Sequence, residues 1–80
     1  MHELAIAQGI IEKVDETAAG RKVRRVIVEI GRDSCVSAEA LAFSFDLVAE
    51  GSAAHGAVLD VRSVMGTTLN VKSMEVEEAA

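Results

Sequence analysis

The chain has 80 residues, a formal charge of −5, one cysteine and no proline or tryptophan. This length is typical of one small domain, so residues 1–80 are treated as a single unit. The lone Cys35 excludes an intrachain disulfide. With only His2 and His55 as imidazoles, a tetrahedral Cys/His zinc site within one chain is excluded as well. The acidic balance argues against nucleic-acid binding, and no apolar run approaches the roughly 20 residues of a membrane-spanning helix.

The first part of the sequence predicts a helix followed by a strand. Apolar residues recur at helical spacing over residues 3–18, with charged side chains between them. Gly20 stands where a glycine commonly ends a helix. From Val23 to Ile30, β-branched residues alternate with polar ones, which predicts a strand that ends in the turn-forming segment Gly31–Ser34.

A second helix and strand are expected next. Ser37 is a suitable N-cap for a helix over residues 38–50. A loop of small residues follows, and it contains His55. Alternating apolar and polar residues then predict a strand over residues 57–64.

The last expected strand, residues 67–77, changes phase along its length. Its apolar residues share one parity up to Val71 and take the opposite parity from Met74 onward. A shift of one residue near Lys72–Ser73 is what a β-bulge produces, so a bulge is predicted there.

These elements predict an α+β fold in the order α-β-α-β-β, with two helices packed on one face of a three-stranded mixed β-sheet. The first two strands should be parallel and joined through the second helix, and the last two should form an antiparallel hairpin. The expected core consists of aliphatic side chains and one phenylalanine: Leu4, Ile10, Ile11, Val14, Val26, Val28, Ile30, Leu41, Phe45, Val48, Leu59, Val61, Leu69 and Val71.

Few residues are suited to catalysis. Cys35 precedes a predicted helix, where a thiol pKa can be lowered, and His2 or His55 is a conceivable base. Nucleophilic catalysis also needs a third group that orients the base, and no motif in the sequence supplies one. A structural role at a turn is favoured for Cys35, so no catalytic residue is predicted and the chain is not expected to be an enzyme.

The first three residues can form a metal site. The bulky His2 in second position favours retention of Met1. The Met1 α-amine, the His2 backbone nitrogen and imidazole, and the Glu3 backbone nitrogen or carboxylate can close around one cation. Consecutive nitrogen-rich chelate rings favour a planar arrangement, which suits Ni(II) or Cu(II) better than Zn(II) or Mg(II). In the alternative interpretation His2 has no metal role and Glu3 only complements the helix dipole.

Five segments, Met1–Ala7, Val23–Gly31, Ala38–Phe45, Gly56–Val61 and Leu69–Glu77, are similar in sequence and order to those of one family. Together they resemble the HypA/HybF nickel-insertion accessory proteins of nickel–iron hydrogenase maturation. The resemblance implies a nickel metallochaperone whose metal ligands are Met1, His2 and Glu3. It also implies two partners, the nickel-handling GTPase HypB and the hydrogenase large-subunit precursor, with urease as a client of some members.

The sequence departs from this family at one place. Family members carry a zinc module with two Cys-x-x-Cys pairs between the last two strands, whereas only Ser63–Thr67 lies there in this chain. The module is therefore expected to be absent at about residues 64–67, and no zinc is expected.

Three further expectations complete the interpretation. The start of the sequence lacks the basic flank of a signal peptide, so a cytoplasmic location is expected. An alternative function is a metal-independent interaction module, or a homodimer formed by exchange of the last strand. His55 could complete a nickel shell from another chain, but an exposed turn residue is the favoured interpretation.

Overall fold

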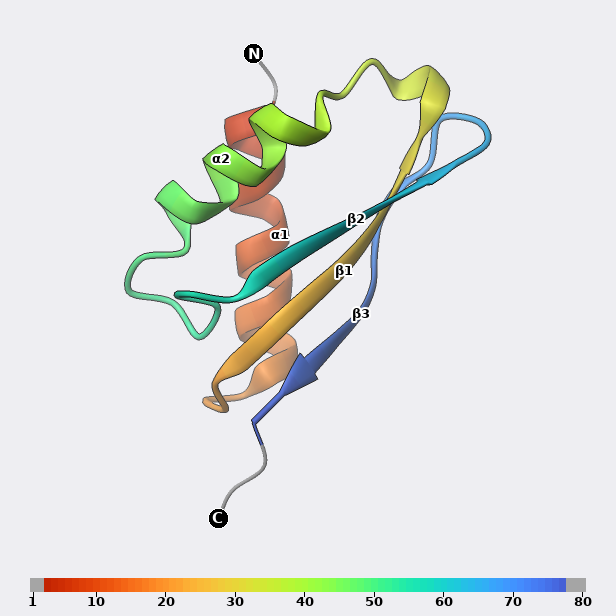
Figure 1. Ribbon diagram of the computed structural model, residues 1–80. Coiled ribbons are helices and arrows are strands. Elements are labelled where there is room, and N and C mark those ends of the chain that lie inside the picture. The colour runs from red at the N-terminus through yellow and green to blue at the C-terminus, as the bar shows by residue number, and fades with distance from the viewer. Residues whose placement is uncertain (1–2, 78–80) are drawn as a thin grey trace.

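The computed structural model describes residues 3–77, and the chain forms an α+β fold (Figure 1). Within these residues, two helices pack on one face of a three-stranded mixed sheet, as expected. The elements are α1 (Glu3–Ala18), β1 (Val23–Gly31), a short 3₁₀ turn η1 (Arg32–Ser34), α2 (Ala38–Val48), β2 (Val58–Val64) and β3 (Leu69–Val76). Helix α2 ends before the predicted residue 50, because Ala49 and Glu50 already belong to the following turn. Over residues 3–77, no helix has both the length and the apolar character needed to cross a membrane.

The strand order is β2-β1-β3, with β1 parallel to β2 and antiparallel to β3. The predicted parallel pair is therefore confirmed, but the predicted β2–β3 hairpin is wrong. Strand β1 is the strand with the most buried residues, and even Ile27 on its outer face is buried. Because burial on both faces favours the centre of a sheet, β1 pairs along both edges and separates β2 from β3.

The core lies between β1 and the two helices. Val26 and Val28 of β1 are fully buried, as are Val14 of α1 and Leu41 and Phe45 of α2. Ile10, Ile11 and Ile30 are buried as predicted, whereas Val48, Leu59, Val61 and Val71 are only partly buried.

Two predicted core residues are exposed instead. Leu4 is 47% exposed, in the first turn of α1 and at the border of its buried stripe. Leu69 is 39% exposed because it begins β3, which forms an edge of the sheet. The spacing of apolar residues in the sequence predicts that such residues face the core. They are buried only where a neighbouring helix or strand covers them.

The predicted bulge is present in β3. Ile27 pairs with Ser73 and the next residue, Val28, pairs with Val71, so Lys72 is the extra residue of β3. The register of the apolar residues changes at this point, which explains the phase shift in the sequence. A bulge and a lysine on an edge strand also oppose unwanted pairing with other strands.

The face of the sheet opposite the helices is charged. The Asp60 carboxylate accepts a hydrogen bond from Arg62 at 3.1 Å and lies 3.7 Å from the Arg25 guanidinium. The hydrogen bond from Arg62 lowers the pKa of Asp60, and the positive charges of Arg62 and Arg25 act in the same direction. These groups are exposed enough that the pairs contribute little to stability.

The connection between β2 and β3 crosses the end of β1, because those two strands lie on opposite sides of it. The Gly31 N–H donates to the Thr68 carbonyl at 2.6 Å, and the Asp33 N–H donates to the Gly66 carbonyl at 2.9 Å. A Cβ atom at Gly31 would overlap the Gly66 carbonyl group, and Gly66 itself has a φ of +90°. The crossing therefore requires a residue without a side chain at position 31.

We predict that Gly31→Ala lowers the free energy of unfolding by about 2 kcal/mol, because backbone atoms must move to accept the methyl group. Urea denaturation followed by circular dichroism measures this loss. Gly9→Ala is the matched control, since Gly9 lies within α1 and a Cβ there meets nothing within 4 Å. That control should gain about 0.5–1 kcal/mol. Equal stability of the Gly31→Ala variant and the unmodified chain would contradict the crossing.

Candidate functional site

Of the three predicted metal ligands, the structure describes Glu3, whereas Met1 and His2 lie outside the described residues. Glu3 is the first residue of α1 and is only 9% exposed. Its Oε2 atom accepts a hydrogen bond from the Ser37 backbone N–H at 3.0 Å. The start of α1 is thereby held against the segment that precedes α2, 34 residues further along the chain.

Ser37 is the N-cap of α2, as predicted. Its Oγ accepts a hydrogen bond from the Ala40 N–H at 3.2 Å, and its carbonyl accepts one from the Leu41 N–H at 2.9 Å. The preceding turn is also held in place, because the Ser34 hydroxyl donates to the Gly31 carbonyl at 2.7 Å. The N–H that Ser37 presents to Glu3 is thus fixed by contacts with the rest of the domain.

The surroundings of the Glu3 carboxyl favour its charged form. A hydrogen bond with the amino-terminal amine, followed by the hydrogen bond from the Ser37 backbone N–H, lowers the pKa of Glu3 to about 2. The carboxylate also lies at the N-terminal end of α2, where the helix dipole favours a negative charge. Glu3 is therefore ionised at every pH at which an amine or an imidazole can bind a metal.

The other candidate residues, Cys35 and His55, are exposed and lie outside the helices and strands. Cys35 is exposed and has a left-handed backbone with a φ of 62° between η1 and α2. His55 is exposed in the loop before β2, where its carbonyl accepts a hydrogen bond from the Lys22 ammonium group at 3.3 Å. Across the described range 3–77, no three His, Cys, Asp or Glu side chains are grouped closely enough to hold a metal ion.

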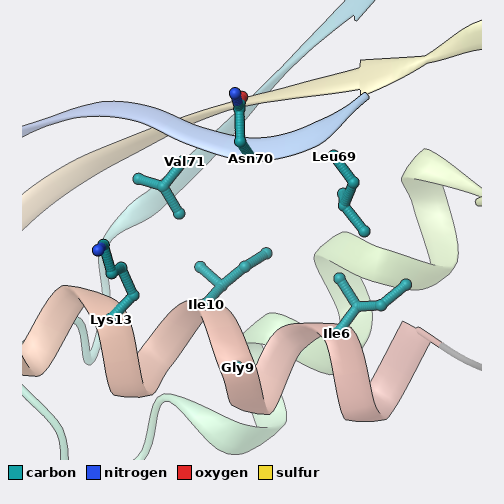
Figure 2. Close-up of a pocket in the computed structure, with 7 residues that line it drawn as sticks. All are labelled: Ile6, Gly9, Ile10, Lys13, Leu69, Asn70 and Val71. Atoms are coloured by element: carbon teal, nitrogen blue, oxygen red, sulfur yellow. The ribbon is translucent and has the colours of Figure 1, made fainter. Parts of the chain in front are cut away.

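A surface feature that the sequence did not reveal is a groove between α1 and β3 (Figure 2). Its volume is about 490 Å³. Figure 2 shows Ile6 and Ile10 of α1 and Leu69 and Val71 of β3 pointing into the space between the two elements. The alternation in residues 67–77 gave no sign of it, because the predicted hairpin would have placed β3 beside β2.

The groove continues along α1. A second hollow of about 370 Å³ shares Lys13 and Val71 with the first. We call the two hollows together the α1–β3 groove. Every ionisable residue that lines it is basic, namely Lys13, Arg21 and Lys72, although the chain as a whole carries a net charge of −5. The groove therefore combines an apolar floor with a basic rim.

Similarity to known sequences covers most of the chain. The family model described as "Hydrogenase/urease nickel incorporation, metallochaperone, hypA" matches residues 1–70. The hydrogenase maturation factor HypA of a Nostoc species is 44% identical over 66 residues, which are 82% of this chain and 58% of the relative. That of Trichormus variabilis is 46% identical over 66 residues, with the same two coverages of 82% and 58%. The chain thus matches little more than half the length of these curated relatives.

The fold is also similar to solved structures. The solution structure of the Ni metallochaperone HypA from Helicobacter pylori aligns with a TM-score of 0.72 at 18% identity, over 98% of this chain and 95% of that one. A second HypA solution structure aligns with a TM-score of 0.67 at 18% identity. At these identities the likeness shows a shared fold.

Proposed function

The chain belongs to the HypA family of nickel-incorporation metallochaperones, and on that premise we propose that it binds Ni(II) at its amino terminus and delivers it to a partner. The family description names an accessory protein for hydrogenase and urease rather than an enzyme. The observation that carries the proposal is the family match, which covers residues 1–70 and therefore includes Met1-His2-Glu3.

The proposed ligands are donors of consecutive residues. The Met1 α-amine, the His2 backbone nitrogen and the His2 imidazole supply nitrogen atoms, and Glu3 completes the set. Small chelate rings of this kind favour planar coordination, which suits Ni(II). The chain is proposed to carry nickel and then release it. A site with few donors at a chain end suits this role, because a partner site with more donors can remove the ion.

On the basis of the family, we also propose that the chain acts in the cytoplasm. Its proposed partners there are the GTPase HypB and the hydrogenase large-subunit precursor. We also propose that the zinc module of the family is absent at about residues 64–67, in the short connection between β2 and β3. The matched part is only 58% of the length of the Nostoc relative, so that relative carries residues that have no match in this chain. The chain would then bind no zinc.

We predict that His2→Ala, and separately one residue added before Met1, each weakens Ni(II) binding by at least about tenfold, because each removes or displaces a nitrogen donor. Isothermal titration of the full chain with its native amino terminus measures the affinity. His55→Ala is the matched control and should leave it unchanged. Affinity should fall as the pH is lowered through about 8 to 6, because the amine and the imidazole gain protons. Equal affinity of the native chain, the His2→Ala variant and the extended variant would refute the proposal.

The α1–β3 groove supports a second function, which is to dock a segment of a partner protein without metal. The occupant that fits is an acidic segment with apolar anchors. Its carboxylates would face Lys13, Arg21 and Lys72, and its apolar side chains would cover Ile10 and Leu69. Such charge pairing at a rim increases association rates and selects for the sign of the partner's charge.

We predict that a 12-residue peptide of alternating Leu and Glu shifts amide resonances of groove residues in a ¹⁵N-labelled chain, and that Lys13→Glu weakens this response. Arg32→Glu is the control, since Arg32 is an exposed basic residue of η1 that does not line the groove. An equal response to a Leu/Lys peptide, or shifts elsewhere on the surface, would rule out an acidic occupant.

The remaining alternative is a homodimer formed by exchange of the last strand. Sedimentation of the free chain tests it, because a strict monomer at high concentration rejects strand exchange.

A further inference from the structure

Strand β2 has an outer edge that pairs with no other strand of residues 3–77 (Figure 1). Its inner edge pairs with β1 without a shift in register, from Arg25 opposite Val58 to Gly31 opposite Val64. Over the same described range, none of the backbone hydrogen bonds outside the helices and strands involves residues 58–64. The N–H and C=O groups that point outward from β2 can therefore pair with a further strand.

The two edges of the sheet differ in their protection against such pairing. At the other edge, β3 carries a bulge and Lys72, and both oppose the addition of a strand. Strand β2 has seven residues in regular register and contains neither a bulge nor a lysine. It begins with Val58, whose exposure is 59%. A regular and partly apolar edge of this kind is a template for one more strand.

The sequence of β2 is complementary to itself when two copies run antiparallel. Directly opposed residues of an antiparallel pair point to the same face of the sheet. A two-fold axis at Val61 pairs all seven residues of one copy with those of the other. Asp60 of each strand then lies opposite Arg62 of the other copy. Two symmetry-related pairs of opposite charge therefore form across the junction.

The same two side chains disfavour the neighbouring registers. An axis at Asp60 or at Arg62 would place two carboxylates or two guanidinium groups opposite each other, and like charges in that position destabilise a sheet. Within one chain Asp60 and Arg62 pair at 3.1 Å, with side chains 29% and 49% exposed. Because such an exposed pair contributes little to stability, exchanging it for a pair between copies costs little. The charges thus select one register and favour a second copy as the partner.

A second copy would also cover apolar side chains of β2. Leu59 and Val61 pack against the core but are only partly buried, because β2 is an edge strand. In the register described above, Val61 of one copy contacts Val61 of the other. A two-fold axis perpendicular to the sheet keeps the helices of both copies on one face, so the two sheets become one continuous sheet.

We propose that the outer edge of β2 is a homodimerisation surface, on which a second copy of this chain adds its own β2 antiparallel, with Val61 at the two-fold axis. Each chain keeps all of its own strands, which distinguishes this dimer from one formed by exchange of the last strand. The proposal goes beyond the proposed nickel function and does not depend on it.

Sedimentation equilibrium of the full chain tests the proposal with two charge variants. The unmodified chain should show a monomer–dimer equilibrium. Asp60→Lys makes both charges of β2 positive and Arg62→Glu makes both negative, so each variant alone opposes like charges across the axis. Each should dimerise at least about tenfold more weakly than the unmodified chain. An equimolar mixture of the two variants should recover the association, because each positive strand then faces a negative one.

Matched controls change the same charges on the other edge strand. Glu75→Lys and Lys72→Glu lie on β3, so both should dimerise like the unmodified chain. Thermal unfolding identifies any variant that has lost its fold.

A cross-link tests the register without changing a charge. In a Cys35→Ser background, Val61→Cys places two thiols opposite each other with Cβ atoms about 5 Å apart, so mild oxidation should give a disulfide-linked dimer. Leu59→Cys is the control, because its two thiols would lie about 13 Å apart along the strands and could not be bridged. If a charge variant does not fold, this comparison still decides.

Four outcomes would overturn the proposal. The first is an unmodified chain that stays monomeric at high concentration. The second is a dimer that Asp60→Lys and Arg62→Glu leave unchanged, which would point to strand exchange. The third is a mixture of the two folded variants that fails to associate. The fourth is equal cross-linking of Val61→Cys and Leu59→Cys, which would show that the strands do not meet in this register.

Discussion

Pairing of β1 along both of its edges is the constraint on which the rest of the structure depends. Strand β1 is parallel to β2 and antiparallel to β3, and Val26 and Val28 on its inner face are fully buried beneath the helices. Since β2 and β3 lie on opposite sides, their connection must cross the end of β1, which is possible only because Gly31 has no side chain. A domain of this size has little other apolar area to bury, so its stability depends on this central strand.

The position of the candidate site depends on the turn that follows β1. The turn after Gly31 leads directly to Ser37 and the start of α2, and that is where the carboxylate of Glu3 is bound. The first residue of α1 thus meets the N-cap of α2, 34 positions further along the sequence. The hydrogen bond between Glu3 and Ser37 therefore joins the start of α1 to the cap of α2.

The edge position of β3 has a separate consequence. Because β3 pairs with β1 alone among the described strands, its Leu69 and Val71 face α1 across an open groove (Figure 2). The basic residues on the rim of that groove stand out in a chain with a net charge of −5. The proposed metal binding and the proposed docking of a partner therefore concern different parts of this small domain, and they can be tested independently.

Local patterns in the sequence determined most elements of this protein. Helical spacing located α1, the Ser37 cap located α2, and the phase shift in residues 67–77 located the bulge at Lys72, because each depends on neighbouring residues alone. The family similarity pointed to Met1, His2 and Glu3. Tertiary structure alone decided the strand order, the exposure of Leu4 and Leu69, the α1–β3 groove and the bond between Glu3 and Ser37. These features join residues far apart in sequence, and no local periodicity records which edge of β1 a later strand will pair with.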